Sequence, residues 1–285
     1  MKVLLSGSSG FVGSHFVDSS SCAIAPFSFR HDDLVAFDFK GVDAVVHLAA
    51  LVHRMEGAPE EEYFRVNTEK TLDLARRAKA AGVGYFLFMS TVKVYGKECE
   101  KCYSESDPCH PVDAYGRSKL EAERGLLALE DEGFRVGIVR SPLVYGSGVR
   151  ANMLQLMRLV VQMPLLPFGG IANRRSLISV ENLVRCLEAM VQGRIGGVYN
   201  VADPRPLSTT ALVTAIARHL GKRRFIFPCL PMAWLLRLLK PQLHRRLYGS
   251  LCVETERLHL MLPELGLQPT EEGIATMAAW YRDVA

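Results

Sequence analysis

Three glycines near the amino terminus constrain the fold of this chain more than any other feature. Gly7, Gly10 and Gly13 follow an apolar run at residues 3–6 and open a helical pattern that ends at residue 19. The first glycine permits a tight turn, the second lets a pyrophosphate approach the backbone, and the third lets the helix pack closely on the sheet. The amino end of the helix then faces the phosphate charge. We therefore expect a strand, turn and helix that bind a dinucleotide through Gly7, Ser9, Gly10, Phe11, Val12 and Gly13.

The remainder of the first half alternates between short apolar runs and helical patterns. This alternation predicts an α/β fold of the Rossmann type, a doubly wound parallel sheet joined by crossover helices. The stretch 31–40 is too short for a full helix and strand. The expected strands are 3–6, 23–29, 44–48, 85–90 and 136–140, and the expected helices are 10–19, 60–81 and 113–131.

The second half has a different character, with short helical patterns separated by turns that contain proline and glycine. Helices are expected at 153–161, 180–192 and 208–220, and a strand at 197–201. We expect residues 1–150 to form the dinucleotide-binding domain, with strands returning to it around 176–202. Residues 151–285 would then form mainly a smaller C-terminal substrate-binding lobe, interleaved with the first domain.

The composition narrows the class of protein. A hydrophobic content of 49% and a charged content of 22% are ordinary for a soluble globular protein of 285 residues. The net charge of +4, taken as spread along the chain, predicts no nucleic-acid partner. No apolar run reaches the length of a membrane span. Met1 leads directly into the first strand, and the seven cysteines show no disulfide framework, so a reduced, cytoplasmic protein is expected.

Tyr115 and Lys119 are the candidate reactive pair. Residues four apart lie on one face of a helix, so both side chains can reach the same ligand. A free phenol, with a pKa near 10, is a poor base at neutral pH. A neighbouring ammonium and a nicotinamide cation would both favour the phenolate. Lowering the pKa of Tyr115 by roughly 3 units would take about 4 kcal/mol of differential stabilisation.

Six segments between residue 1 and about residue 200 carry a resemblance. They are 7–13, 47–50, 66–68, 89–96, 115–119 and 140–146. In this order and spacing they resemble the extended short-chain dehydrogenases/reductases, in the group of nucleotide-sugar epimerases and dehydratases. The set is specific for the fold and chemistry of that family and much less specific for the substrate, and the C-terminal part of the chain matches more loosely.

The resemblance implies roles for three residues. Tyr115 would be the acid/base, Lys119 would bind the nicotinamide ribose and tune Tyr115, and Thr91 would hold the substrate oxygen. A hydroxyl suits that last role because it can donate and accept at once; the alternative is that Thr91 only ends a strand. The cofactor groove would also be lined by Leu48, Ala49, Ala50 and Asn67, with His47 beside them.

The choice between NAD and NADP stays open. An acidic residue about 20 positions after the glycines would accept the ribose hydroxyls of NAD, whereas an arginine suits the extra phosphate of NADP. The chain offers Arg30 first, and then Asp32 and Asp33. Arg30 is a candidate cofactor contact that favours NADP, but the local pattern is irregular and leaves both nucleotides open.

The residues after Thr91 bear on the reaction. Dehydratases of the family have an acidic pair, or an Asp-Lys pair, at the positions that Val92 and Lys93 occupy here. Valine cannot donate a proton, which disfavours 4,6-dehydration. Chemistry at a single carbon remains, either a C4 epimerase or a C4 ketoreductase, and the resemblance points to surface-polysaccharide pathways. Lys93 either reaches the substrate or points outward at a strand end.

The resemblance also implies a UDP-sugar as the substrate partner. Asn152, Arg175 and Arg245 would hold the diphosphate, and Phe168 would lie near the uracil. Leu143 stands where the family often has asparagine, which is a departure from the pattern. Two alternatives are a reductase of a non-nucleotide ketone, against which Asn152 and Arg175 argue, and a non-catalytic NAD(P)-sensing protein, against which Tyr115 and Lys119 argue.

Three further features have competing explanations. Cys99, Cys102 and Cys109 have the short spacing of zinc ligands but lie in a variable loop, so we expect loop thiols and no metal. Residues 232–246 form a basic amphipathic pattern, for the core or lid of the substrate lobe or for a membrane surface. A homodimer through the helices at 60–81 and 113–131 is also expected from the resemblance.

Overall fold

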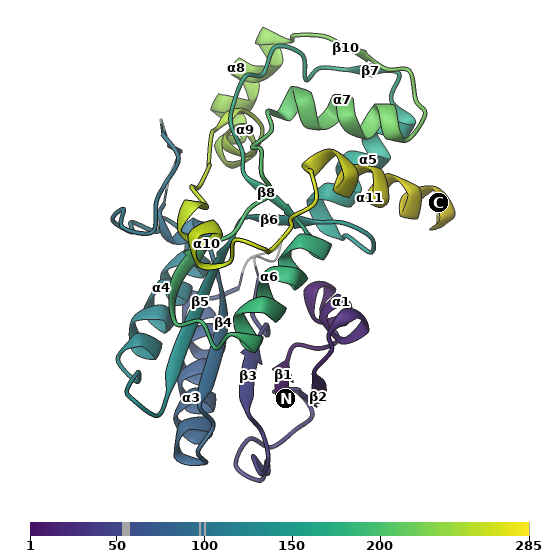
Figure 1. Ribbon diagram of the computed structural model, residues 1–285. Coiled ribbons are helices and arrows are strands. Elements are labelled where there is room, and N and C mark those ends of the chain that lie inside the picture. Colours follow the sequence, from purple (N-terminus) through teal and green to yellow (C-terminus); the bar gives the residue numbers. More distant parts are fainter. Residues whose placement is uncertain (53–57, 97, 100, 285) are drawn as a thin grey trace.

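The computed structural model describes residues 1–52, 58–96, 98–99 and 101–284. Six strands form one parallel sheet in the order β2-β1-β3-β4-β5-β9 (Figure 1). The strands of this sheet are β1 (Lys2–Ser6), β2 (Ala23–Phe27), β3 (Ala44–His47), β4 (Tyr85–Thr91), β5 (Arg135–Ser141) and β9 (Gly197–Asn200). The Rossmann-type α/β fold expected from the sequence is confirmed, and β9 from the second half joins the sheet of the first.

Helices cover both faces of the sheet because its strands are apolar on both sides. Val3 and Leu5 of β1 pack with α1 and α6 in one core, whereas Leu4 packs in the opposite core with α3 and α4. All three side chains are fully buried. The first half of the chain contributes α1 (Phe11–Ser19), α2 (Glu60–Phe64), α3 (Lys70–Ala80) and α4 (Ala114–Leu127), and the second half contributes α6 (Val180–Gln192).

The expected helix at 60–81 is present but is not uniform. A π-helical turn, Arg65–Glu69, separates α2 from α3 without breaking the helical path. The stretch 31–40 contains neither helix nor strand, as its length predicts. Arg117 of α4 pairs with Glu60 of α2 through a 2.9 Å contact between Nη2 and Oε2. A homodimer through these helices stays a prediction.

The upper part of the molecule in Figure 1 is the C-terminal lobe. Two short parallel pairs lie here, β6 with β8 and β7 with β10. Its core is formed by apolar side chains of α5, α7 and α11 together with the short strands. The elements of this half are β6 (Leu143–Tyr145), α5 (Ala151–Gln162), β7 (Leu165–Leu166), β8 (Leu177–Ser179), α7 (Thr209–His219), β10 (Phe225–Ile226), α8 (Leu230–Leu239), α9 (Pro241–Tyr248), α10 (Glu256–Met261) and α11 (Thr270–Val284).

The basic helix expected at 232–246 is two helices. Lys240 leaves the helical conformation with φ −138° and ψ 66°, and Pro241 begins α9. Proline lacks the amide proton that a helix interior requires but is well suited to the first helical turn. The sequence therefore contained the signal for the break. Neither α8 nor α9 contributes a buried residue to the core of the lobe.

Among the described residues, no helix combines the length and the apolar character needed to cross a membrane.

Candidate active site

The carboxyl ends of β1, β3 and β4 meet at one edge of the sheet, which is where parallel α/β folds bind their ligands (Figure 1). Gly7 follows β1 with φ 79°, a conformation that glycine adopts without strain. A Cβ on Gly7 would lie 2.7 Å from the amide nitrogen of Ala49, after β3. The turn therefore lies against the backbone of the predicted cofactor groove, with no space for a side chain between them.

Gly13 shows the same restriction on the helix side of the turn. A Cβ there would lie 2.1 Å from the carbonyl oxygen of Gly7, and one on Gly10 would lie 3.1 Å from the same atom. The amide of Gly10 donates to that oxygen at 3.0 Å. The turn is thus held close to the amino end of α1, and this cradle has the shape that a dinucleotide pyrophosphate requires.

Replacing Gly13 by alanine is expected to open the turn, because the added methyl group overlaps a backbone oxygen that cannot rotate away. We expect affinity for a nicotinamide dinucleotide to fall by about tenfold or more, equivalent to about 1.4 kcal/mol. Fluorescence titration with the dinucleotide checks this. Gly133→Ala is the matched control, since the nearest atom to its Cβ would be 3.7 Å away. Equal affinities in the two variants would contradict the close approach.

His47, at the end of β3, is a packed histidine joined to polar partners on both sides. Its Nδ1 lies 2.6 Å from Ser6 Oγ, and its Nε2 lies 2.8 Å from Thr71 Oγ1. The Thr71 hydroxyl donates its proton to the carbonyl oxygen of Asn67 at 2.8 Å, so it accepts from Nε2 of the neutral imidazole. Burial, assisted by the charge of Lys119, lowers the pKa of His47 to about 3.

This shift predicts a loss of stability in acid. The unfolded chain takes up a proton as the pH falls below 6.5, whereas His47 in the folded protein stays neutral down to about pH 3. Stability is therefore fully present above pH 6.5 and declines by up to about 1.4 kcal/mol per pH unit below it. Urea denaturation at several pH values measures the slope. His47→Gln should reduce the slope and the surface variant His259→Gln should not; identical slopes in all three proteins would exclude this origin.

Asn67 lies within the π-helical turn and is completely buried. Its Oδ1 accepts from the amide of Leu51 at 2.8 Å, while Nδ2 donates to the carbonyl of Leu51 and to Ser118 Oγ, both at 3.1 Å. Both amide protons are thus used within the protein. Asn67 therefore holds Leu51 in place and connects it to α4. A direct contact between Asn67 and the cofactor stays a prediction. Irregular helical turns of this kind are frequent at functional sites.

Tyr115 lies in the first turn of α4, which begins where the Asp113 carboxylate accepts from the amide of Gly116 at 2.7 Å. Thr91, at the end of β4, is 7% exposed and forms a side-chain hydrogen bond with Tyr115. Burial raises the pKa of Tyr115, and the charge of Asp113 adds to the rise, while the hydrogen bond with Thr91 opposes it. In the protein alone the side chain is therefore a neutral phenol next to a hydroxyl.

Lys119 is 1% exposed and points into the space beneath β4. Its ammonium donates to the carbonyl oxygen of Met89 at 2.8 Å and lies 4.3 Å from the centre of the Phe88 ring. Burial lowers the pKa of Lys119 to about 7, and the charge of Glu123, one turn further along α4, opposes this. Lys119 is thus held against the residues of β4 that precede Thr91, and its reach to a ligand shared with Tyr115 stays a prediction.

The lysine over the Tyr115 ring is Lys93. Its Nζ lies 5.4 Å from the ring centre and 2.7 Å from the carboxylate of Asp113. The sequence left this residue between a substrate contact and an outward strand-end lysine, and the structure places it beside the reactive tyrosine. The predicted lowering of the Tyr115 pKa by cations is absent from the protein alone, where burial dominates.

A buried ion pair behind the site was not anticipated. Arg140 of β5 and Glu123 of α4 form a bidentate pair, with Nη2 to Oε2 at 2.7 Å, and their side chains are 7% and 2% exposed. Arg140 also donates to the Tyr95 hydroxyl at 2.9 Å, and Ser90 donates to Glu123. The pair therefore connects β5 with the helix that carries Tyr115, and the Ser90 hydroxyl joins β4 to the same network. The only sequence signal was the presence of charge in otherwise apolar segments.

The predicted substrate residues are distributed over the lobe. The Arg175 guanidinium donates to the backbone carbonyl oxygens of Gly249 at 3.0 Å and Arg245 at 3.5 Å, so this contact is with the main chain of Arg245 and not with its side chain. Burial lowers the pKa of Arg175. Asn152 is exposed at the start of α5, next to Ala151 with φ 53°. Phe168 is 6% exposed within the lobe core, so its ring lies among apolar side chains of the protein.

The loop after β2 contains the candidate residues for nucleotide choice. Asp32 accepts from the amide of Ser28 at 2.6 Å, and therefore folds back toward the end of β2. Arg30 is exposed, and its amide donates to Ser28 Oγ at 3.3 Å. A carboxylate and a guanidinium thus share this short loop.

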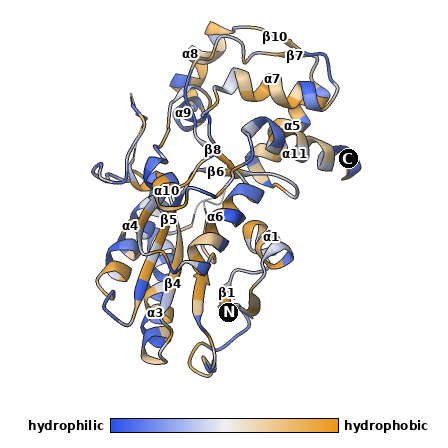
Figure 2. Ribbon diagram, in the orientation of Figure 1, coloured by the Kyte–Doolittle hydropathy of each residue, from blue (hydrophilic) through white to orange (hydrophobic). Residues whose placement is uncertain are grey.

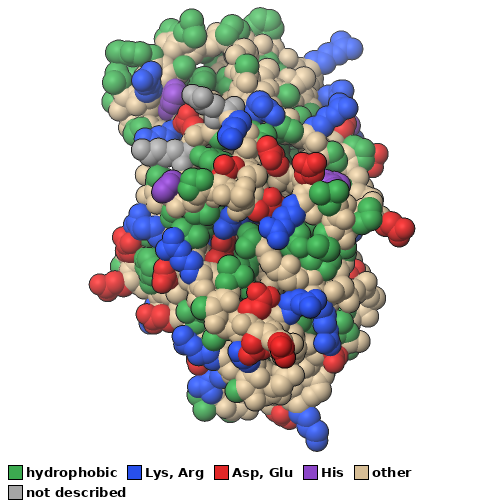
Figure 3. Space-filling view, turned by 60° about the vertical axis from the view of Figure 1, so that its left-hand side comes forward, with side chains coloured by type: hydrophobic (Ala, Val, Ile, Leu, Met, Phe, Trp, Pro, Cys, Tyr) green, Lys and Arg blue, Asp and Glu red, His purple; other side chains and the backbone are tan. Residues whose placement is uncertain are grey.

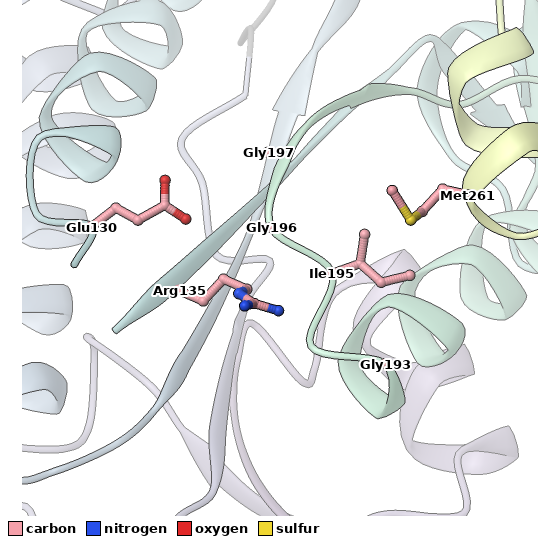
Figure 4. Close-up of a pocket in the computed structure, with 7 residues that line it drawn as sticks. All are labelled: Glu130, Arg135, Gly193, Ile195, Gly196, Gly197 and Met261. Atoms are coloured by element: carbon pink, nitrogen blue, oxygen red, sulfur yellow. The ribbon is translucent and has the colours of Figure 1, made fainter. Parts of the chain in front are cut away.

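An open hollow of about 460 Å³ lies away from Thr91 and Tyr115 (Figure 4). It is lined by Glu130, Arg135, Gly193, Ile195, Gly196, Gly197 and Met261, at the amino ends of β5 and β9. This is the edge of the sheet opposite to Tyr115. Glu130 accepts from the amide of Val136, and Arg135 donates to the carbonyl of Arg194, both at 3.2 Å. Its charged side chains are thus engaged in the fold, and the hollow is not the reactive site.

The three loop cysteines have different neighbours in the structure. Cys99 Sγ lies 3.6 Å from Cys252 Sγ, and Cys102 also forms a hydrogen bond with Cys252, whereas Cys109 packs against Tyr95 and its neighbours. Within the part of the chain that the structure describes, no group of three or more His, Cys, Asp or Glu side chains could hold a metal ion.

A glycine-rich turn, a tyrosine and a lysine four residues apart on one helix and a threonine at a strand end, on a parallel sheet, form the arrangement expected of a Rossmann-type short-chain dehydrogenase/reductase. Comparison with known proteins gives the family. The profile described as "NAD dependent epimerase/dehydratase family" matches residues 30–202. The chain belongs to this family, which uses a nicotinamide dinucleotide, and the resemblance seen in the sequence is confirmed.

Individual relatives agree with this family. A Vibrio cholerae protein named UDP-glucose 4-epimerase is 36% identical, over 97% of this chain and 94% of its own length. An Escherichia coli O157:H7 protein named N-acetyl-α-D-glucosaminyl-diphospho-ditrans,octacis-undecaprenol 4-epimerase is 28% identical over 78% of this chain and 73% of its own. The solved structure of MoeE5 in complex with UDP-glucose and NAD is 25% identical, with a TM-score of 0.77, and the alignment covers 100% of this chain and 99% of that one.

Proposed function

We propose that this protein inverts the configuration at C4 of a UDP-hexose, using an NAD that stays bound between the two halves of the reaction. The observation that carries the proposal is the hydrogen-bonded pair of Thr91 and Tyr115, which lies at the same sheet edge as the glycine cradle. Similarity to the Vibrio cholerae UDP-glucose 4-epimerase over nearly the whole of both chains supports the substrate class and the position of reaction.

The residues suggest how the protons move. The Thr91 hydroxyl holds the O4 oxygen of the sugar, and Tyr115 removes its proton and later returns it. A nicotinamide dinucleotide held by the glycine turn would supply the hydride chemistry at C4, removal from one face and return to the other. The positive charge of Lys93, whose Nζ lies 5.4 Å from the centre of the Tyr115 ring, would favour the phenolate, and we assign the same effect to Lys119. The sugar regains the same atoms with C4 inverted, so no net oxidant is consumed.

The surroundings of Thr91 favour single-carbon chemistry. Val92, in the position where dehydratases need a proton donor, is 3% exposed and packs in an apolar cluster. The neighbouring lysine is paired with Asp113. Val92 can neither donate nor accept a proton, and Lys93 is engaged in an ion pair, so the two positions lack the acidic partner that chemistry at C5 and C6 requires. A 4,6-dehydration is therefore disfavoured by structure as well as by sequence.

The proposed cofactor is NAD. The Asp32 carboxylate at the end of β2 suits the hydroxyls of an unmodified ribose and would repel the extra phosphate of NADP. Arg30, on the same loop, is the residue that would favour NADP. An epimerase must keep its hydride between half-reactions, which also favours a tightly held nucleotide.

The proposed biological role is the supply of sugar precursors for surface polysaccharides, which the name of the Escherichia coli relative supports. In this chain Arg175 and Arg245 are the proposed diphosphate ligands, with Asn152 at the open end of α5. The carbonyl contacts of Arg175 hold its guanidinium in place, and its remaining N–H groups can meet phosphate oxygens.

Mass spectrometry of the small molecules released on denaturing the purified protein tests the proposal. We expect NAD or NADH in amounts close to one per chain. The protein without added cofactor should also convert UDP-glucose, or its N-acetylated or uronic acid counterpart, into the C4 epimer. An empty protein that oxidises added NADPH with a 4-keto UDP-sugar would show a ketoreductase instead. Failure to bind UDP would favour a ketone that carries no nucleotide.

A further inference from the structure

The outer face of α8 is apolar and uncovered. Leu230 is 80% exposed, Trp234 66% and Leu239 70%, and Leu235 and Leu238 are exposed to a similar degree. Figure 2 shows α8 as a largely hydrophobic helix at the margin of the lobe, and hydrophobic side chains gather at the upper end of the molecule in Figure 3. We call Leu230, Trp234, Leu235, Leu238, Leu239 and Leu243 the α8 face.

The spacing shows that this exposure is organised. Residues 230, 234 and 238 form one row at four-residue steps on α8, and Leu235 and Leu239 form a second. Leu243 lies beyond the break at Lys240, on α9. Met232, Ala233 and Leu236 lie on the inner side and are half-buried. Single exposed leucines need no explanation, but a contiguous apolar patch on a soluble protein marks an interaction site. The sequence expectation that this segment forms part of the core of the lobe is wrong for the α8 face.

Charge identifies the kind of partner. Residues 230–248 contain Arg237, Lys240, Arg245 and Arg246, with His244 and no aspartate or glutamate. The whole chain has 34 basic and 30 acidic residues, so removing these four leaves 30 of each. This short segment thus carries four uncompensated positive charges, as many as the net charge of the whole chain, next to the α8 face.

We propose that α8 and α9 dock on the surface of an anionic lipid bilayer. A tryptophan and leucines can enter the boundary between headgroups and acyl chains, while Lys and Arg extend along the helix to reach the phosphates. Anionic lipids attract clustered basic residues near such a surface. With ten residues, α8 is about 15 Å long, which suits a helix lying in the plane of the interface.

A second copy of the chain is the less suitable occupant. A symmetric contact through this face would place the same cluster of cations on both sides, and the segment contains no carboxylate to compensate. The inference is independent of the proposed reaction. It concerns where the protein lies in the cell. The end of α9 is held to the lobe, because Asn173 Nδ2 donates to the carbonyls of Leu247 and Gly249 at 3.2 and 2.9 Å. Docking of α8 and α9 would therefore place the substrate lobe at the bilayer.

Tryptophan fluorescence with vesicles provides the test. The chain has two tryptophans, so Trp280→Phe leaves Trp234 as the only reporter. Its emission should shift to shorter wavelength with vesicles of phosphatidylcholine and phosphatidylglycerol, and much less with phosphatidylcholine alone. The protein should sediment with the anionic vesicles, and added salt should weaken the binding. No sedimentation with anionic vesicles at low salt would overturn the proposal.

Variants on the apolar and basic sides separate the two contributions. Leu235→Glu with Leu239→Glu, and separately Arg237→Gln with Lys240→Gln, should each reduce vesicle binding by about tenfold or more. Leu260→Glu, at a leucine that is 78% exposed on α10, and Arg76→Gln on α3 are matched controls and should bind as the parent does. Conversion of a soluble UDP-sugar should be unchanged in all four proteins, so loss of vesicle binding is distinguishable from loss of activity.

Self-association is the competing outcome. Analytical ultracentrifugation without lipid would then show a dimer that Leu235→Glu with Leu239→Glu converts to a monomer. Such a result, together with equal vesicle binding by the parent and that variant, would replace the bilayer by a second copy as the occupant.

Discussion

Replacing Tyr115 by phenylalanine lowers turnover by about 10²–10⁴-fold, the usual contribution of a positioned general acid/base. The change removes a single oxygen atom, from a ring that Lys93 and the backbone of α4 hold in place. Thr91 keeps its position because its Oγ1 also accepts from the amide of Lys93 at 3.3 Å. The cradle of glycines is untouched, so the variant should retain its nicotinamide dinucleotide and its affinity for UDP.

The control is Tyr199→Phe, at a buried tyrosine whose hydroxyl donates to the carbonyl oxygen of Gly196 at 3.2 Å, near the opposite edge of the sheet. It should lower the free energy of unfolding by about 1 kcal/mol and leave turnover unchanged. Steady-state kinetics and the absorbance of the bound nucleotide measure both effects. Near-normal turnover in Tyr115→Phe would remove this residue from the reaction.

Replacing Arg140 by methionine lowers the free energy of unfolding by about 3–5 kcal/mol, because it leaves the carboxylate of Glu123 buried without its counter-ion. Ser90 still donates to that carboxylate. The Glu123 side chain is only 2% exposed, however, and one hydroxyl does not compensate its buried negative charge. The substitution should also affect Lys119, because the charge of Glu123 opposes the lowering of the Lys119 pKa by burial. Urea denaturation gives the free energy.

The double variant Arg140→Met with Glu123→Leu is the informative control. Removing both charges replaces the pair by apolar groups of similar size, and stability should recover by several kcal/mol relative to the single variant. A single variant within about 1 kcal/mol of the parent would mean that the pair does not hold β5 to α4.

Local signals were sufficient to predict most of the sheet and the reactive helix. The strands are short buried runs, the turn requires glycine at Gly7 and Gly13, and Asp113 begins α4 as a side-chain cap. Each depends on neighbours within a few positions. The four-residue spacing that places Tyr115 and Lys119 on one helix is a property of any helix, so their location on α4 could be predicted from the sequence, and their roles in the reaction stay a prediction.

Contacts between segments that are far apart in the sequence could not be predicted from it. Arg140 and Glu123 are 17 residues apart, Lys93 and Asp113 are 20 apart, and Cys99 and Cys252 are 153 apart. No spacing rule predicts such pairs, because the fold decides which segments meet. The α8 face shows the same limit. An amphipathic pattern identifies an apolar face but does not say whether the protein itself covers that face.

Transfer of hydrogen at C4 tests the central claim most directly. The protein would be incubated, without added nucleotide, with UDP-glucose, UDP-N-acetylglucosamine or UDP-glucuronic acid carrying deuterium at C4, and the products examined by NMR. We predict that at least one sugar gives its C4 epimer with the deuterium retained at C4, because Tyr115 exchanges only the O4 proton and the bound nicotinamide returns the hydride. Formation of no epimer, or an epimer that has lost the deuterium to solvent, would contradict a retained-hydride epimerase.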